Sequence, residues 1–169
     1  MSCGVQCQAK TKTGSQCKLN TCKQYPYCWI HQKSLEGLQV KKSTVPGAGE
    51  GLFYVGKPDV EAKSKVTLYS AKKVNTDRIN GNYVLEVSKN KFLDAEDKSN
   101  FVGRYINSTR GTGKQPNVKF SGTREIKEIK NRQTVPVLAV KKIKKDTELL
   151  LNYGRGYKFD PKTNKKNKK

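Results

Sequence analysis

Acidic residues are scarce in this chain: 14 Asp and Glu stand against 35 Lys and Arg, which leaves a net charge of +21 over 169 residues. Aromatic residues make up only 8% of the chain, and there is one histidine and one tryptophan. A charge of this size exceeds what solubility requires, so it predicts contact with a polyanion such as nucleic acid. Charge alone does not predict which base sequence would be recognised.

Long hydrophobic runs are also missing, since no stretch approaches the roughly 20 apolar residues that cross a bilayer. No secretory signal pattern precedes the first cysteine. We therefore expect a soluble, intracellular protein. The length allows one domain of ordinary size plus a small appendage.

Cysteine is absent after position 28, and the only histidine, His31, follows that last cysteine closely. Five cysteines form an odd number, and without a secretory signal they favour metal binding over disulfides. Thiolate and imidazole ligands suit tetrahedral zinc, with Zn–S distances of about 2.3 Å. Four protein ligands leave no open position, so the predicted site is structural. The spacing C-x9-C-x10-C-x2-H selects Cys7, Cys17, Cys28 and His31 as the ligands.

The first 37 residues are thus predicted to be a zinc-binding module with a short linker. A segment this short buries too little apolar surface to fold alone, so the metal would supply its folding energy. Its C-x-A-x-T-x-x-G-x-x-C opening and Y-C-W-x-H close resemble short Cys/His modules of large DNA viruses and phages. Cys3 and Cys22 are spare in this assignment, with Cys22 the alternative ligand. The competing interpretation is a disordered leader with unliganded cysteines.

Short β-favouring runs separated by turns predict a mainly β fold after this module. Pro136 lies within one such run and predicts the edge or the start of a strand. Ser99 is expected to cap a short helical turn that runs into Val102. The tail from Lys162 contains only Lys, Asn and Thr and is expected to be disordered. The predicted strands lie near residues 40–43, 52–53, 66–69, 83–87, 92–95, 118–120, 135–140 and 148–151.

Gly103–Phe120 is the central stretch, with the sequence G-R-Y-I-N-S-T-R-G-T-G-K-Q-P-N-V-K-F. Its small polar residues favour a turn, and its backbone donors suit a small polar ligand. Read alone, it is an ordinary surface turn. The glycine-rich stretch Pro46–Gly51 is not a phosphate-binding P-loop, because no G-K-[ST] follows it.

Three motifs together resemble the SET-domain protein lysine methyltransferases over about residues 38–158. G-A-G-E-G-L-F at Gly47–Phe53 is similar to the family's opening strand. G-R-Y-I-N-S-T with the later P-N, within Gly103–Asn117, is similar to its R-F-I-N-H-S-x-x-P-N. I-K-K-D-T-E-L-L-L-N-Y-G at Ile143–Gly154 is similar to I-x-x-G-E-E-L-x-x-D-Y-G. In size and in lacking a cysteine-rich segment after the domain, the chain is similar to compact viral members.

The resemblance implies a pseudoknotted β fold that binds S-adenosylmethionine on one face and a lysine on the other, joined by a narrow channel. It implies Tyr153 and Tyr69 as catalytic residues and Tyr69, Tyr105 and Leu151 as channel residues, with Leu151 at the family's Phe/Tyr switch. The implied cofactor-binding residues are Gly49, Glu50, Gly51, Leu52, Arg104, Asn107, Ser108, Tyr153 and Tyr157, with Phe159 able to close over the cofactor.

Two features differ from the family pattern. Ser108 stands where the family has a histidine, and the loop between Thr109 and Pro116 is longer by about four residues. That loop carries Arg110 and Lys114.

The family's usual substrates are histone tails, which are basic, so a cleft on this basic protein needs local acidity. Four carboxylates precede the central stretch and could form that rim: Glu86, Asp94, Glu96 and Asp97. We therefore predict a lysine methyltransferase for histones or other nucleic-acid-associated proteins, located in a nucleus or a viral replication site. The basic tail spans residues 159–169, and its part from Lys162 could serve as a polyanion contact or a weak nuclear signal. The alternative is a non-catalytic nucleic-acid- or chromatin-binding protein.

Overall fold

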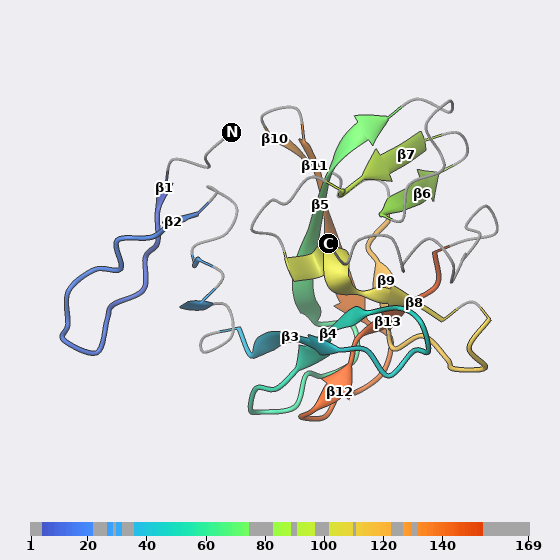
Figure 1. Ribbon diagram of the computed structural model, residues 1–169, viewed down its shortest axis with the longest axis horizontal. Coiled ribbons are helices and arrows are strands. Elements are labelled where there is room, and N and C mark those ends of the chain that lie inside the picture. The colour runs from blue at the N-terminus through green and yellow to red at the C-terminus, as the bar shows by residue number, and fades with distance from the viewer. Residues whose placement is uncertain are drawn as a thin grey trace.

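Two long antiparallel strands, β5 (Lys65–Val74) and β11 (Arg132–Ala139), run through the middle of the molecule (Figure 1). Their register pairs Tyr69 with Val135 and Thr67 with Val137. Directly paired residues point to the same face of a sheet, so these side chains share one face. The computed structural model describes residues 5–21, 27–28, 30–31, 36–74, 83–88, 91–96, 102–109, 111–122, 127–129 and 132–153.

The main sheet continues on both sides of this central pair, in the order β10-β11-β5-β7-β6, with β9 also paired to β11. All these pairings are antiparallel. The outer strands are β6 (Val84–Ser88), β7 (Lys91–Asp94), β9 (Val118–Phe120) and β10 (Lys127–Ile129).

A second sheet lies against the other end of the molecule, in the order β12-β4-β3. A parallel pair, β13-β8, lies beside it and next to the short 3-10 helix η2 (Figure 1). These elements are β3 (Leu38–Lys42), β4 (Glu50–Tyr54), η2 (Val102–Tyr105), β8 (Asn107–Ser108), β12 (Thr147–Glu148) and β13 (Leu150–Leu151).

Pro136 lies inside β11, which has neighbours on both sides, so the prediction of a sheet edge or strand start is wrong. The backbone N–H of Ser121 donates to the Pro136 carbonyl at 2.9 Å. Since the N and C=O of one strand residue face the same side, the missing N–H of Pro136 also faces the β9 side. There β10 pairs residues 132–134 and β9 pairs residues 137–139. Pro136 therefore lies between the part of β11 that pairs with β10 and the part that pairs with β9, so its missing N–H interrupts neither set of hydrogen bonds.

One hydrophobic core joins both sheets and η2. Its fully buried members include Leu52 of β4, Tyr69 of β5, and Ile106, which follows η2. Alternation along β5 buries Thr67, Tyr69 and the following Ala71 on one face, as a half-buried strand requires. Complete burial of a large apolar side chain contributes roughly 1.5–3 kcal/mol. The fold is mainly β, as predicted.

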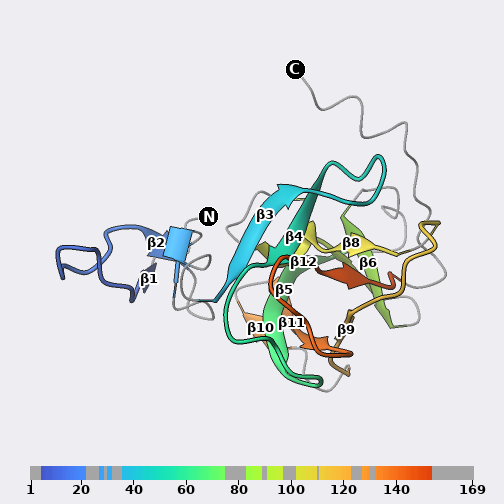
Figure 2. The same ribbon diagram turned by 90° about the horizontal axis from the view of Figure 1, so that it is seen from below.

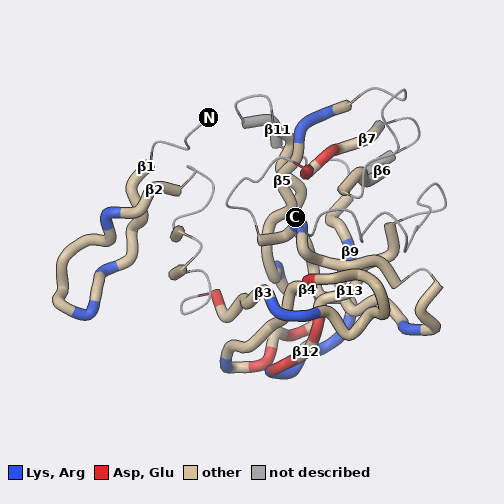
Figure 3. The backbone as a smooth tube through the Cα atoms, viewed as in Figure 1, with Lys and Arg blue, Asp and Glu red and all other residues tan. Residues whose placement is uncertain are grey.

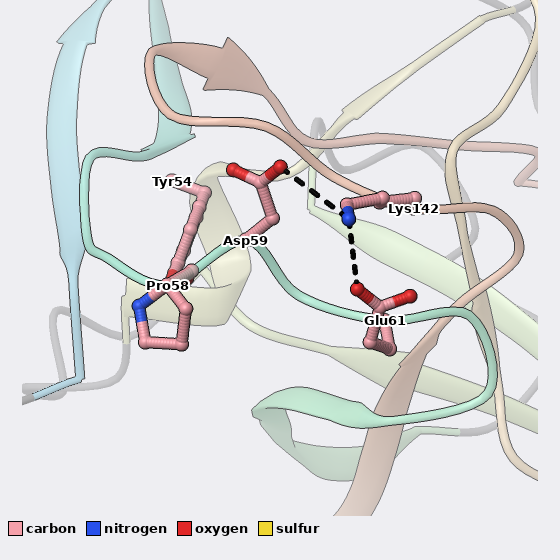
Figure 4. Close-up of polar contacts among 5 residues, drawn as sticks. All are labelled: Tyr54, Pro58, Asp59, Glu61 and Lys142. Carbon is pink, nitrogen blue, oxygen red and sulfur yellow. Dashed lines mark hydrogen bonds and ion pairs between the residues drawn. The ribbon is translucent and has the colours of Figure 1, made fainter.

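Lys142 joins two loops at the surface beyond β4 (Figure 4). Its Nζ lies 3.0 Å from Glu61 Oε1 and 3.8 Å from Asp59 Oδ2. The hydrogen bond to Glu61 is the main cause that raises the pKa of Lys142. Nearby, the Tyr54 hydroxyl donates to the Pro58 carbonyl. The ion pairs of Lys142 are exposed, so they fix loop geometry more than they stabilise the fold.

The N-terminal hairpin, β1 (Val5–Gln6) and β2 (Asn20–Thr21), stands to one side of both sheets in two perpendicular views (Figures 1 and 2). It has its own small buried cluster, made mostly of cysteines. Among the described residues, no helix is long and apolar enough to span a membrane.

Candidate functional site

The four predicted metal ligands come together in the N-terminal module. Antiparallel bonds draw the hairpin closed, with the Cys7 N–H donating to the Leu19 carbonyl and the Cys17 N–H to the Ala9 carbonyl. Gly14 has φ +84° at the hairpin tip, a conformation that favours glycine. The Thr21 hydroxyl donates to the Tyr27 carbonyl at 3.0 Å, which holds the later ligand segment against the hairpin.

The ligand atoms of Cys7, Cys17, Cys28 and His31 all lie within 4.8 Å of one another. The Sγ atoms of Cys17 and Cys28 are 4.0 Å apart, and His31 Nδ1 lies 3.3 Å from Cys28 Sγ. In tetrahedral zinc with sulfur and nitrogen ligands, neighbouring ligand atoms are roughly 3.5–3.8 Å apart. The donor set and the spacing therefore fit one structural zinc ion.

The Cys7 thiol is also prepared to accept metal. Its burial raises the pKa, but backbone hydrogen bonds, chiefly from the Cys28 N–H at 3.2 Å, outweigh burial and leave the pKa of Cys7 below its ordinary value. Backbone donors stabilise the thiolate, which is the form that binds zinc.

A second site forms where two distant segments meet, at the parallel pair of β8 and β13. Leu150 pairs with Asn107 and Leu151 with Ser108. Asn117 adds a clamp, because its amide donates to the Glu148 carbonyl at 2.7 Å and its side-chain oxygen accepts from the Leu150 N–H at 2.8 Å. The C-terminal part of the domain is thereby held beside the central stretch.

Tyr153 makes a further contact between these two segments, and we call their meeting point the junction. Its hydroxyl donates a hydrogen bond to the backbone carbonyl of Ile106, directly before Asn107. Tyr153 is 6% exposed, and Ile106 is fully buried. A buried hydroxyl with its proton directed to a carbonyl presents its oxygen as a hydrogen-bond acceptor. The resemblance implies Asn107 and Tyr153 in one cofactor site, and the structure brings the two segments together. The implied channel stays a prediction.

Asn107 connects the β8–β13 pair to the glycine-rich loop, residues 46–51. Its amide donates to the Glu50 carbonyl at 2.8 Å and to Ser43 Oγ at 3.1 Å, and lies 3.4 Å from Glu148 Oε1. Gly51 allows this approach, because a Cβ there would lie 2.3 Å from Glu148 Oε1. Leu52, the next residue, is fully buried and anchors the loop in the core.

Glu148 is the centre of this polar group and is only 6% exposed. Its Oε1 accepts from Ser43 Oγ at 2.5 Å, and its Oε2 accepts from the Thr44 N–H at 2.8 Å and from the Thr44 hydroxyl. Burial raises the pKa of Glu148, but these hydrogen bonds and that of Asn107 outweigh it and hold the pKa below its ordinary value. The carboxylate is therefore charged at neutral pH.

Aromatic side chains line the neighbouring part of the core. Tyr69 is 1% exposed, and its hydroxyl donates to the Tyr83 carbonyl at 3.0 Å. Phe120 of β9 meets its ring edge-on, with centroids 5.4 Å apart. The buried Arg104 guanidinium stacks on the Tyr83 ring at 4.0 Å and lies 5.5 Å from the Tyr105 ring. Burial is the main cause that raises the pKa of Tyr105.

The structure thus brings most of the predicted site residues into one region. Gly49 lies at the open tip of the glycine-rich loop, with φ +74° and no atom within 4 Å of the point that a Cβ would occupy. Leu151 is buried in β13, and Ser108 is buried beside it in β8. Their roles stay predictions. Tyr157, Phe159, Cys3, Cys22, Arg110, Asp97 and Ser99 lie outside the described residues.

Sequence reasoning misses two residues of this region, Glu148 and Phe120. Glu148 stands in a motif that gives it no role, and its donors Ser43 and Thr44 lie more than 100 residues away, so no local pattern reveals its contacts. Phe120 is predicted only as part of a half-buried strand. Its contact with Tyr69 depends on β9 and β5 both pairing with β11, which no local pattern reveals.

A family model of the SET domain matches residues 8–154. The match covers most of the chain, so this protein belongs to the SET-domain family, whose members are protein lysine methyltransferases. The match begins within the cysteine-rich module. A comparison with curated proteins found no match.

Solved structures support the same fold. The crystal structure of the Chaetomium thermophilum polycomb repressive complex 2 gives a TM-score of 0.53 at 22% identity over 71% of this chain. A humanized mutant of that complex bound to the inhibitor GSK126 gives a TM-score of 0.53 at 21% identity over 71% of this chain. An active polycomb repressive complex 2 in the stimulated state gives a TM-score of 0.52 at 23% identity over 70% of this chain. The aligned part is 15% of each of those chains, so the likeness concerns the fold of one domain.

Proposed function

We propose that this protein is an S-adenosylmethionine-dependent protein lysine N-methyltransferase. The observation that carries the proposal is the junction of Asn107 with Tyr153, where the Tyr153 hydroxyl is fixed on the Ile106 carbonyl beside the glycine-rich loop. The chain's membership of the SET family supports this assignment.

The residues of the junction fit an S-adenosylmethionine site by their chemistry. Gly49 leaves space for a ligand to approach the backbone, and the polar group around Asn107 holds that backbone in place. Gly49, Glu50, Arg104 and Asn107 are the residues that would hold the cofactor. When bound, S-adenosylmethionine supplies an electrophilic methyl group.

The chain's own residues would prepare the substrate amine. A lysine amine has a pKa of about 10.4 in water and must lose its proton to act as a nucleophile. Aromatic surroundings such as Tyr69 and Phe120 disfavour the charged form by desolvation and so lower that pKa. The Tyr153 oxygen, whose proton is directed to Ile106, would accept a hydrogen bond from the amine and orient its lone pair.

Histones or other nucleic-acid-associated proteins are the proposed substrates. Asp94 and the exposed Glu96 supply carboxylates near β7 that suit a basic peptide. Lysines spread over the rest of the surface, including the β1–β2 loop, where Lys10, Lys12 and Lys18 are exposed (Figure 3). No acidic residue occurs before Glu36. Such a surface suits nucleic acid bound beside the substrate.

Calorimetry with S-adenosylmethionine and with S-adenosylhomocysteine tests the cofactor part of the proposal, and absence of binding would favour the non-catalytic alternative.

A salt titration tests the nucleic-acid part of the proposal. Methylation of nucleosomes should fall more steeply with salt than methylation of a free histone peptide, because phosphate contacts release counterions. Equal salt dependence of the two would remove the nucleic-acid role. Location in a nucleus or a viral replication site stays a prediction.

A further inference from the structure

Lys114 makes a contact that the family pattern does not provide for, because it lies in the loop that is longer in this chain. Its Nζ donates to the Thr44 carbonyl at 3.1 Å and to Thr44 Oγ1 at 2.5 Å, across 70 residues of sequence. Both acceptor atoms belong to one residue, so the ammonium group binds the backbone and the side chain of Thr44 at the same time.

The loop holds Lys114 in this position by its own turns. The Thr112 N–H and hydroxyl both donate to the Thr109 carbonyl, at 3.2 and 2.6 Å. The Lys114 N–H donates in turn to Thr112 Oγ1 at 3.1 Å. The local hydrogen bonds therefore fix residues 111–114 before the lysine side chain reaches out.

Thr44 is the point at which this loop joins the polar group of the candidate cofactor site. Its hydroxyl accepts from Lys114 and donates to Glu148, whose other oxygen is bound by Ser43 and lies near Asn107. The Ser43 N–H donates to the Gly49 carbonyl at 2.8 Å, which closes the loop of residues 43–49. Lys114 thus forms hydrogen bonds with one end of the 43–50 loop, at Thr44, and Asn107 forms one with the other end, at Glu50.

We propose that Lys114 is a positioning residue that fixes the 43–50 loop through Thr44 and thereby sets the affinity of this enzyme for its adenosyl cofactor. The inference rests on the proposed function. A cation that completes a buried carboxylate network lowers the freedom of the segment that the cofactor would contact, and a site fixed beforehand binds with less ordering cost. The longer loop is then part of the site and not a passive insertion.

The test compares Lys114→Met with Lys114→Arg and with Lys119→Met. Lys119 is exposed on β9, so its substitution removes the same charge away from Thr44. We expect Lys114→Met to weaken S-adenosylhomocysteine binding by roughly three- to tenfold in calorimetry, which is the scale of one ordinary intramolecular hydrogen bond, since both bonds of Lys114 are exposed. Lys114→Arg should restore most of the affinity, because a guanidinium can donate to the same two oxygens.

Hydrogen exchange of the free protein supplies a second readout that does not need cofactor. Backbone amides of residues 43–45, 47 and 48 should exchange several-fold faster in Lys114→Met and at the wild-type rate in Lys119→Met. In kinetics, the KM for S-adenosylmethionine should rise while kcat changes little.

Equal exchange of residues 43–48 in the two methionine variants, or equal loss of affinity in both, would overturn the role of Lys114. A wild-type protein that binds no S-adenosylhomocysteine would overturn the proposed function and with it the cofactor role of Lys114. The exchange comparison would then still report whether Lys114 fixes the loop.

Discussion

The hydroxyl of Tyr153 donates to the backbone carbonyl of Ile106, 47 residues earlier in the chain. This hydrogen bond joins the last described residue to the residue before Asn107, next to the parallel pairing of β8 and β13. It places a buried tyrosine hydroxyl at the point where the glycine-rich loop, the central stretch and the C-terminal segment meet. The candidate site is a consequence of this crossing.

Replacing Tyr153 by Phe should lower the free energy of unfolding by about 1–3 kcal/mol, because the buried Ile106 carbonyl loses its donor. Urea unfolding measures the change. Tyr54→Phe is a matched control, since the Tyr54 hydroxyl also donates to a backbone carbonyl, that of Pro58, but away from the junction. A comparable stability loss in both variants is expected. No loss in Tyr153→Phe would contradict the hydrogen bond.

Gly51→Ala should destabilise the protein by about 1–3 kcal/mol, the cost of overpacking a well-packed site. The added Cβ would meet Glu148 Oε1 at 2.3 Å and Asn107 Nδ2 at 3.2 Å, so the carboxylate would have to move. Gly122→Ala is the control, because no atom lies within 4 Å of its Cβ position. It should change stability by less than about 0.5 kcal/mol. Equal thermal shifts for the two variants would refute the packing described for Gly51.

Glu148 should make stability depend on pH. Its folded-state pKa lies below the ordinary value of 4.5, so its contribution is present above that value and is lost as the pH falls through the folded pKa. Glu148→Gln should therefore lower stability at pH 7 and flatten the acid side of the profile relative to wild type. Urea midpoints between pH 7 and pH 3 measure this.

The matched control for this experiment is Glu61→Gln, which alters an exposed carboxylate in the same way. It should leave both the midpoint at neutral pH and the acid slope close to wild type. A Glu148→Gln variant with the wild-type slope would show that the carboxylate is not held in its charged form by Ser43 and Thr44.

The N-terminal module should contain one zinc ion per chain, measurable by elemental analysis of the purified protein. Cys17→Ser should lose this zinc, because a structural site needs all four ligands. Cys3→Ser and Cys22→Ser should keep it. The main core is separate from the module's cluster, so chelation should unfold the module while the melting of the main core changes little. Zinc retained by Cys17→Ser would instead favour Cys22 as a ligand.

The parts of the structure that the sequence predicts well are those set by chemistry at short range or by a motif. Cys28 and His31 are a tight ligand pair, and their type and spacing are enough to predict the cluster. The strand Val118–Phe120 follows from simple alternation of apolar and polar residues. The resemblance implies Asn107 and Tyr153 in one cofactor site, and the segments that carry them do lie side by side.

The parts that the sequence does not predict depend on partners far away in the chain. The run 66–69 predicts a short strand, but β5 extends to Val74 because its polar end, Lys72–Val74, pairs with β7. β11 can contain Pro136 because this residue lies between the segments of β11 that pair with β10 and with β9. Glu148 finds its donors, Ser43 and Thr44, more than 100 residues away. Local propensity contains no information on such pairings.

Methyl transfer measured by mass spectrometry is the most direct test of the proposed function. The purified protein would be incubated with S-adenosylmethionine and with histones or nucleosomes, beside Tyr153→Phe and Tyr54→Phe. We predict methylated lysine with the wild type and with Tyr54→Phe, and a loss of at least about 100-fold in rate with Tyr153→Phe, the scale of a lost catalytic group. Methylation by Tyr153→Phe at the rate of Tyr54→Phe would contradict the central role of the Tyr153 junction.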